Sequence, residues 1–178
     1  PQTTVAAGHD TLTGIENLIG SAFNDTLTGD WGANIIEGGL GNDVMDGGVG
    51  DDTVSYAGAG AGVTVSLAIA TGQNTIGAGT DTLAGFEHLR GSAFADTLAG
   101  NAGINMLQGG LGNDRLTGGA GSDKIVGGVG TDTAVFAGNR SAHVITRNAD
   151  AGWTVSGPEG SDTLFSVERV QFADQTIS

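Results

Sequence analysis

GGLGNDVMDGGVGDDTVS, residues 38–55, consists of two successive nine-residue units, each of the form GGxGxDxUx with U a large apolar residue. A pattern that returns at a fixed interval is the signature of a repeat architecture, in which each unit packs on its neighbours. The interval of nine residues therefore decides how the rest of the chain is divided.

Nine such units lie in two blocks. The first block, residues 20–55, holds four units, and the second, residues 91–135, holds five. Residues 1–46 align with residues 72–117 at a constant offset of 71, and a third, partial copy begins at Gly160. The chain is therefore an internal duplication. Because Pro1 falls inside a module, we expect the parent sequence to continue upstream.

Composition and charge exclude several classes of protein. Apolar residues make up 38% of the chain and aromatic residues 5%, too few for an ordinary globular core, and the 34 glycines are placed too regularly for a flexible linker. The net charge of −14 disfavours nucleic-acid and anionic-membrane partners and favours a cation. The absence of Cys excludes disulfides and thiolate metal sites, and no apolar run is long enough for a transmembrane segment.

Each unit predicts a tight turn followed by a short strand. Glycine reaches positive φ without steric cost, so the hexad GGxGxD forms the turn, and the middle residue of the xUx triplet points inward. The predicted inward residues are Leu27, Ile36, Met45, Val54, Leu98, Leu107, Leu116, Ile125 and Ala134. Residues 62–70 also alternate apolar and polar side chains, which predicts a half-buried strand between the blocks.

Two units close one coil of 18 residues, so that unit i lies over unit i+2. The turn aspartates then stack at the coil spacing of about 4.8 Å, which is strongly repulsive unless a cation lies between them. Ca²⁺ suits such turns because it accepts carboxylate and backbone carbonyl oxygens in flexible geometry, whereas Mg²⁺ demands a strict octahedron. We expect about five or more Ca²⁺ ions, one for each stacked pair.

The predicted fold is all-β, a parallel β-roll (β-solenoid) in two tandem duplicated blocks with intervening and C-terminal capping strands. We expect a first module over residues 1–58 with repeats in 20–55, a connecting strand and loop over 59–78, and a second module over 79–138 with repeats in 91–135. Residues 139–178 are expected to form C-terminal strands and a partial third module. No 3.6-residue apolar period predicts a helix.

Five complete hexads in register resemble the RTX, or haemolysin-type, calcium-binding repeat family. The resemblance implies a β-roll with Ca²⁺ between successive turns. It also implies export by a type I secretion system to the exterior of a Gram-negative bacterium, and hence an extracellular or cell-surface location. It covers residues 20–58 and 91–138 closely.

The candidate metal-site residues are the hexad glycines and the turn Asp and Asn residues. They are Asp25, Asn34, Gly38, Gly39, Gly41, Asp43, Gly47, Gly48, Gly50, Asp52, Asp96, Asn105, Gly109, Gly110, Gly112, Asp114, Gly118, Gly119, Gly121, Asp123, Gly127, Gly128, Gly130 and Asp132. Asn34 and Asn105 drop a charge, so their sites should be weaker. Phe23 and Phe94 replace the second turn glycine, so the first turn of each block should act as a cap.

No catalytic constellation is found. His9, His88 and His143 are isolated, without HExxH or paired spacing, and no GxSxG occurs. For the recurring glutamates Glu16, Glu87 and Glu168, a structural hydrogen bond or charge pair at a module junction is favoured over an additional cation ligand or a catalytic acid.

The sequence leaves alternative roles for several apolar residues. Cap packing is favoured for Trp31 and Trp153 over stacking on sugar rings. Outward-facing Ile35, Val44 and Met106 form either a contact patch for another chain or a surface covered by the intervening strands.

Three functions are consistent with these features. The first is a calcium-binding structural module that folds on Ca²⁺ binding outside the cell and is not itself an enzyme. The second is the non-catalytic C-terminal module of a larger extracellular hydrolase, peroxidase or polysaccharide epimerase. The third is a component of a surface or adhesive assembly, with self-association or other surface proteins as partners.

Overall fold

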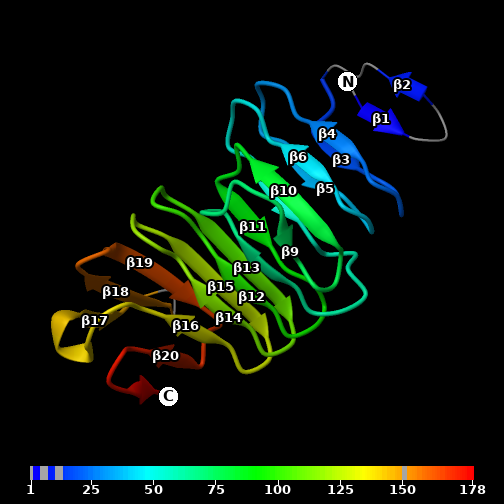
Figure 1. Cartoon of the computed structure of the whole chain (residues 1–178). Helices are drawn as coiled ribbons and strands as arrows, with labels where there is room; N and C mark the ends of the chain where they lie inside the picture. Colours follow the sequence, from blue (N-terminus) through cyan, green and yellow to red (C-terminus); the bar gives the residue numbers. More distant parts are fainter. Residues whose placement is uncertain (1, 5–7, 11–13, 150–151) are drawn as a thin grey trace.

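The chain forms a β-roll in which the nonapeptide strands stack into flat walls joined by tight turns (Figure 1). The computed structural model describes residues 2–4, 8–10, 14–149 and 152–178, with side-chain burial from residue 14 onward. One wall is a single sheet that runs through both repeat blocks and into the C-terminal strands. Its strands, in spatial order, are β17 (Val144–Arg147), β18 (Trp153–Gly157), β19 (Gly160–Phe165), β15 (Lys124–Val129), β13 (Met106–Leu111), β11 (His88–Arg90), β7 (Thr53–Ser55), β5 (Ile35–Glu37) and β3 (Asn17–Ile19).

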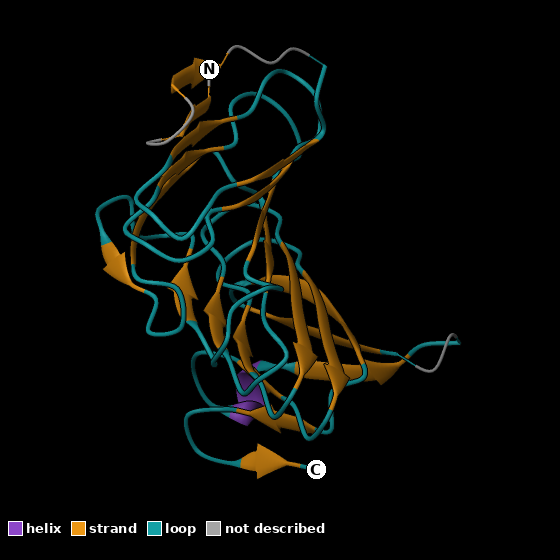
Figure 2. Cartoon of the chain, turned by 90° about the vertical axis from the view of Figure 1, so that its right-hand side faces the viewer, coloured by secondary structure: helices purple, strands orange, loops and turns teal. Residues whose placement is uncertain are grey.

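The opposite wall is divided into two sheets. The N-terminal sheet has the order β2 (Gly8–Asp10), β1 (Gln2–Thr4), β4 (Thr26–Thr28), β6 (Val44–Asp46), β10 (Thr80–Ala84) and β9 (Gln73–Asn74). The C-terminal sheet has the order β21 (Thr176–Ile177), β20 (Arg169–Gln171), β16 (Thr133–Val135), β14 (Arg115–Thr117), β12 (Thr97–Ala99) and β8 (Thr64–Ser66). Figure 2 shows the two walls from the side, with the β17–β18 hairpin projecting from the roll.

The 18-residue coil is confirmed by the strand register. Leu27 pairs with Met45 on one wall, and Leu98 pairs with Leu116 on the other, each in parallel strands. The predicted inward residues are all buried: Met45 is 1% exposed and the other eight are 0% exposed. These side chains form the core because only the middle residue of each nonapeptide triplet faces inward.

The segment between the blocks continues the roll rather than separating two of them. After β7 the chain forms β8, which pairs with β12 ahead of it, and then returns through β9 to β10, which pairs with β6 behind it. β11 then pairs with β7 in the nine-stranded sheet. The two blocks therefore share one wall.

Some local expectations need correction. The strand predicted over residues 62–70 is only three residues long, and Ile69, expected inward, is 43% exposed. The expectation of cap packing for Trp31 is wrong, because its side chain is 88% exposed at a turn. Ile35 and Val44 are exposed and Met106 is partly exposed, so the intervening strands do not cover them. Among the described residues, the helical content is the short 3₁₀ turn η1 (Arg140–Ala142).

The two C-terminal strands predicted around a turn near residue 148 are β17 and β18, which pair antiparallel. β18 then pairs antiparallel with β19, so the hairpin extends the nine-stranded sheet beyond the last coil. No helix among the described residues is long and apolar enough to cross a membrane.

Leu116→Ala tests the stacked core. Leu116 is 0% exposed and lies between Leu98 and Ala134 in neighbouring coils, so truncation leaves a cavity that its neighbours on two sides cannot fill. We expect a loss of about 2–5 kcal/mol in the free energy of unfolding at saturating Ca²⁺, measured by urea denaturation. The outward neighbour Arg115→Ala should cost no more than about 0.5 kcal/mol; equal losses would contradict the assigned inward face.

Candidate calcium-binding turns

The turn aspartates are tied to one another by hydrogen bonds from coil to coil. The backbone N–H of Asp25 donates to Oδ1 of Asp43 at 2.9 Å, and that of Asp96 donates to Oδ1 of Asp114 at 2.9 Å. The same bond, at 2.7–2.8 Å, joins three further pairs 18 residues apart: Asn34 to Asp52, Asn105 to Asp123, and Asp114 to Asp132. The predicted ladders of side chains are therefore confirmed, and each is a chain of charge-assisted hydrogen bonds.

The ladders continue through residues outside the nonapeptide blocks. Asp81 and Asp162 accept the N–H groups of Asp43 and Asp123 at 3.0 and 2.7 Å. The GxD context of both was visible in the sequence, although they were not among the candidate site residues. For Asp52 and Asp132 the corresponding acceptors are Glu87 and Glu168.

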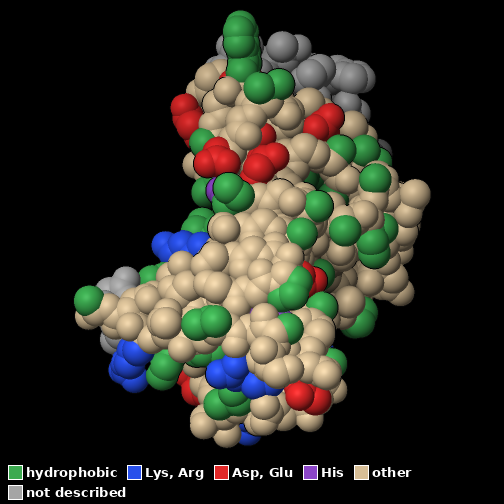
Figure 3. Space-filling view, turned by 90° about the vertical axis from the view of Figure 1, so that its left-hand side faces the viewer, with side chains coloured by type: hydrophobic (Ala, Val, Ile, Leu, Met, Phe, Trp, Pro, Cys, Tyr) green, Lys and Arg blue, Asp and Glu red, His purple; other side chains and the backbone are tan. Residues whose placement is uncertain are grey.

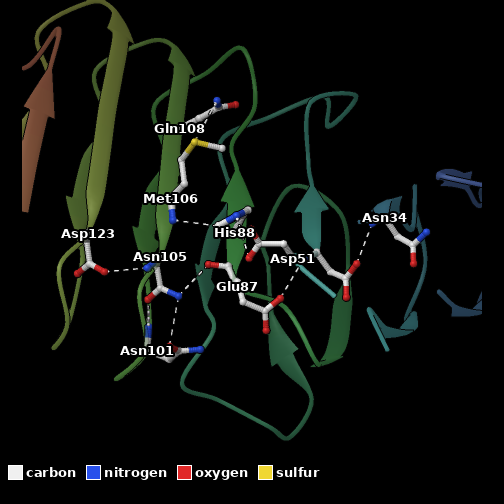
Figure 4. A network of polar contacts seen from close by, with 10 residues as sticks. Asn34, Asp51, Glu87, His88, Asn101, Asn105, Met106, Gln108 and Asp123 are labelled. Atoms are coloured by element: carbon white, nitrogen blue, oxygen red, sulfur yellow. Dashed lines mark hydrogen bonds and ion pairs between the residues drawn. The ribbon is translucent and has the colours of Figure 1, made fainter. Parts of the chain in front are cut away.

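The recurring glutamates make structural hydrogen bonds. Oε2 of Glu87 accepts the N–H of Asp52 at 2.9 Å (Figure 4). Oε2 of Glu168 accepts the N–H of Asp132 at 2.8 Å. Each therefore takes the place that an aspartate takes elsewhere in the ladder. Glu16 participates through its carbonyl, which accepts the N–H of Ile35 at 2.7 Å.

One oxygen in each complete hexad is buried and accepts no hydrogen bond from any described residue. These oxygens are Oδ2 of Asp43, Asp52, Asp114, Asp123 and Asp132. Oδ1 of Asp25 has the same property at the N-terminal end of the ladder. A buried carboxylate oxygen without a donor is costly, so each complete hexad requires a proton or a cation. At Asp25 the other oxygen, Oδ2, already accepts two hydrogen bonds from Ser21.

The second glycine of the hexad is the reason that this aspartate oxygen has no donor. Gly39, Gly48, Gly110, Gly119 and Gly128 have φ between +95° and +120°. The four other turns have Ser21, Asp30, Ser92 and Asn101 at this position, and the described residues with positive φ do not include them. There the residue's own N–H donates to the turn side chain: Ser21 to Asp25 at 2.6 Å, and Asn101 to Asn105 at 2.8 Å.

We call the two kinds open and closed turns. An open turn has GG and an unpartnered aspartate oxygen, and a closed turn satisfies that oxygen from its own backbone. The remaining closed turns show the same bond, from Asp30 to Asn34 at 2.8 Å and from Ser92 to Asp96 at 2.6 Å. Ser21 and Ser92 also donate their hydroxyl groups to the turn aspartates. The first turn of each block is thus a closed turn, as its Phe-containing sequence suggested for a cap.

Asn34 and Asn105 each face a backbone carbonyl group of the preceding coil. Nδ2 of Asn105 donates to the carbonyl of Glu87 at 2.8 Å, and Nδ2 of Asn34 donates to the carbonyl of Ile15 at 3.1 Å. A carboxylate at either position would face an acceptor instead of a donor. Figure 4 shows Asn105 between the Glu87 carbonyl and Asp123.

Burial of the open-turn carboxylates raises their pKa. Desolvation, together with the neighbouring Asp81 and Asp25, raises the pKa of Asp43 to about 6. Desolvation and the flanking Asp96 and Asp132 raise the pKa of Asp114 to about 6. Desolvation likewise raises the pKa of Asp52, Asp123 and Asp132.

The open turns fit Ca²⁺ by donor type and by space. A Cβ atom on the first glycine of the hexad would overlap the unpartnered oxygen, as at Gly38 and Gly118, and one on the second glycine would overlap a carbonyl of the preceding coil, as at Gly39. Glycine is thus needed where carboxylate and carbonyl oxygens converge. In the described part of the chain no three His, Asp or Glu side chains form a metal-binding group. A cation here would take many ligands from backbone carbonyls, which Ca²⁺ accepts.

The histidines serve the scaffold where their side chains are described. Nδ1 of His88 accepts the N–H of Met106 at 3.1 Å, and its Nε2 lies 3.6 Å from Oδ1 of Asp51 (Figure 4). His143 is buried against the rings of Phe136 and Phe172, with Nδ1 3.1 Å from the carbonyl oxygen of Asn139. The side chain of His9 lies outside the described residues.

The ladder that runs through Asp43 ends at Asp81, where two hydroxyl groups that the sequence did not reveal contact the carboxylate. Oδ2 of Asp81 accepts hydrogen bonds from the Tyr56 hydroxyl at 3.1 Å and the Thr75 hydroxyl at 3.4 Å, and all three side chains are buried. Burial, followed by the charge of Asp81, raises the pKa of Tyr56 above its ordinary value. The junction between the blocks is therefore satisfied by the protein's own donors.

The fold and the open turns define a calcium-binding β-roll. The profile of the RTX calcium-binding nonapeptide repeat, which spans four copies, matches residues 10–45, 19–54, 28–61, 81–103 and 99–134. These matches cover more than half of the chain, and the chain belongs to this family.

Among solved structures, the chain is similar to the extracellular lipase LipA from Serratia marcescens, with 17% identity and a TM-score of 0.23. The similarity covers 92% of this chain and 39% of the lipase, so the chain spans well under half of that protein. A search of the curated proteins found no match.

The raised carboxyl pKa values predict an unusual pH dependence for the metal-free protein. Asp43 and Asp114 have a pKa of about 6 in the roll, against about 3.9 in an unfolded chain. Between these values the folded state binds more protons, so the free energy of unfolding falls as pH rises. In chelator we expect the greatest stability near pH 4 and a loss towards pH 7, measured by urea unfolding. Stability that increases over this range would contradict the assignment.

Proposed function

We propose that this chain is a structural module that folds when Ca²⁺ binds to its open turns, within a protein that is exported and works outside the cell. The observation that carries the proposal is the set of five buried, unpartnered carboxylate oxygens, one in each complete hexad. Their positions match the repeat that defines the family. The module itself is proposed to be non-catalytic.

Each open turn would hold one Ca²⁺, giving five in the described roll. Oδ2 of the hexad aspartate supplies the charged ligand, and turn carbonyls of the same and neighbouring coils supply the others. The ion supplies positive charge between stacked carboxylates. Oδ1 of the same aspartate accepts a backbone N–H of the preceding coil, and the glycines keep the turn free of Cβ atoms. We propose that the closed turns hold no cation, because their own backbone N–H groups satisfy the side-chain oxygens.

Coupling of binding to folding would serve export. A chain with a net charge of −14 and no ion between its carboxylates repels itself, which favours the unfolded state where Ca²⁺ is scarce. Where Ca²⁺ is abundant, each site adds RT ln(1 + [L]/Kd) to the stability of the folded state. The folded roll could then serve a larger extracellular enzyme or a surface assembly.

Circular dichroism with and without chelator tests Ca²⁺-dependent folding. At pH 7 we expect the strand signal to be lost in chelator and restored by Ca²⁺ but not by Mg²⁺. Asp114→Ala should remove one bound Ca²⁺ in equilibrium dialysis and raise the Ca²⁺ midpoint of folding. A strand signal that does not change on removal of Ca²⁺ would contradict the proposal.

A reciprocal pair of isosteric variants tests the division into open and closed turns. Asp123→Asn keeps the shape of an open turn but removes its charge, and should lower the number of bound Ca²⁺ ions by one. Asn105→Asp, in the coil next to it, should add no Ca²⁺ ion and should cost about 1–3 kcal/mol, because the Glu87 carbonyl loses its donor. An extra ion bound by Asn105→Asp would show that charge alone makes a site.

A further inference from the structure

The sequence GxDTLxxxE occurs three times, at residues 8–16, 79–87 and 160–168. We call these stretches the first, second and third junction segments. In each of them the residue two positions before the glutamate has a positive φ: +66° at Gly14, +64° at Gly85 and +49° at Ser166. A positive φ is uncommon for a residue with a side chain, so the position requires this conformation whichever residue occupies it. The three segments therefore share one backbone turn.

The second junction segment holds the last coil of the block that precedes it. The N–H of Asp52, in the last complete hexad of the first block, donates to Oε2 of Glu87 at 2.9 Å. The carbonyl oxygen of Asp52 accepts the N–H groups of Glu87 and His88 at 3.1 and 2.9 Å. The third segment holds Asp132, in the last hexad of the second block, by the same three bonds from Glu168 and the residue after it. Each of these two segments is thus a docking site for the final GGxGxD coil of a block.

The first junction segment presents the same groups at a free strand edge. β3 is the end strand of the nine-stranded sheet, whereas β11, at the same position of the second copy, lies between β7 and β13 (Figure 1). Within the described part of the chain, the carboxylate of Glu16 has no donor, and the N–H groups of Glu16 and Asn17 have no acceptor. These are the groups that hold Asp52 in the second copy.

The apolar residue before the glutamate differs in exposure in the same way. Phe86, next to the docked coil of the first block, is 5% exposed, whereas Ile15 at the same position of the first segment is 40% exposed. A docked coil would remove the Ile15 side chain from water, which favours docking.

The opposite wall also ends in a free edge. Gln2 pairs with Asp10 across β1 and β2 in the same register in which Gln73 pairs with Asp81 across β9 and β10. On its other side β10 pairs with β6 of the preceding block, whereas β2 is the end strand of its sheet. The strands that receive a preceding coil in the second copy therefore lie at sheet edges in the first copy, on both walls.

A second copy of the chain offers no coil for this edge. In the described roll, the backbone N–H of each complete-hexad aspartate already donates to a carboxylate: Asp43 to Asp81, Asp52 to Glu87, Asp114 to Asp132, Asp123 to Asp162, and Asp132 to Glu168. The occupant must be a different GGxGxD block, whose last coil has no acceptor of its own. In both observed cases the docked aspartate precedes its glutamate in the same chain, by 35 and 36 residues.

We propose that the first junction segment docks the last coil of a further GGxGxD block that lies N-terminal to it in the same polypeptide. Glu16 accepts the N–H of the last hexad aspartate of that coil, and the N–H groups of Glu16 and Asn17 bind its carbonyl oxygen. Ile15 is covered by the coil. The nine-stranded sheet then continues past β3 by strand addition, as it continues past β11 to β7.

The charge of this end makes docking depend on a cation. Residues 1–89 contain 11 acidic residues and no Lys or Arg. On the face in Figure 3, Asp and Glu side chains gather toward the N-terminal end, and Lys and Arg side chains lie farther along the roll. An incoming coil brings its own hexad carboxylates, which this end repels unless Ca²⁺ occupies the open turns of the coil. The inference rests on the proposed function for that Ca²⁺.

A fusion protein tests the docking. A second copy of residues 1–71 joined to the N-terminus supplies a complete first block, and the offset of 71 places its added copy of Asp52 35 residues ahead of Glu16. In saturating Ca²⁺ we expect the amides of Glu16 and Asn17 to exchange hydrogen at least about tenfold more slowly in the fusion than in the present chain, measured by NMR. The matched control lacks residues 47–55 of the added copy, and with them the docking strand, and should show no such protection.

Glu16→Ala tests the role of the carboxylate. In the present chain this variant should leave the Ca²⁺ midpoint of folding unchanged, because the side chain is exposed and has no donor among the described residues. In the fusion it should reduce the protection of Asn17 about fivefold or more, because a buried N–H loses a charged acceptor. Glu87→Ala, at the position where a coil is already docked, should raise the Ca²⁺ midpoint of the present chain.

The docking and the proposed function can fail separately. Equal exchange of Glu16 and Asn17 in the fusion and the present chain, or an added block that stays unfolded at saturating Ca²⁺, would overturn the docking. Ca²⁺-dependent folding of the present chain by circular dichroism would remain intact in that case. Conversely, slow exchange of both amides in the fusion, together with a circular dichroism signal of the present chain that is the same in chelator and in Ca²⁺, would support the docking and contradict the proposed function.

Discussion

The structure depends on one constraint: every coil places a carboxyl or amide group beneath the backbone of the preceding coil. In a carboxyl group one oxygen accepts an N–H group of that coil, as Asp43 does from Asp25 and Asp114 does from Asp96, whereas the amide of Asn105 donates to a carbonyl there. This bond sets the register of the stack, and the middle residue of each strand is buried as a consequence. The same placement leaves the second oxygen in the interior of the turn, where its charge cannot be solvated.

Open and closed turns differ in whether that second oxygen accepts a hydrogen bond. In the closed turns a backbone N–H of the same turn satisfies it, and at Asp81 the hydroxyls of Tyr56 and Thr75 do so. In the five open turns, glycine at positive φ takes the place of the donating residue, and the oxygen remains without a donor. The roll thus combines coils that are complete in themselves with coils that require a cation, in one continuous wall. We therefore propose a cation only in the turns where both glycines are present.

The junction between the blocks shows how a repeat can be interrupted without ending the roll. β8 pairs with a strand ahead of it and β10 with a strand behind it, while β7 and β11 remain neighbours in the nine-stranded sheet. The junction turn over residues 76–81 reads IGAGTD, and Ile76 adopts a φ of +64° at the position where the repeats have glycine. A β-branched residue in this region is strained. Its neighbours Thr75 and Asp81 belong to the hydroxyl cluster that closes the ladder.

The sequence by itself determined the repeat, the 18-residue coil, the inward face and the type of cation, because each follows from local spacing and residue chemistry. Leu27 and Leu98 are buried for reasons visible in the nonapeptide alone. It could not determine how the other turns are satisfied, since that depends on which backbone N–H or carbonyl group faces the side chain, as the Glu87 carbonyl faces Asn105. Nor could it show the shared wall or the exposure of Trp31, because both depend on how strands far apart in the chain come to lie side by side.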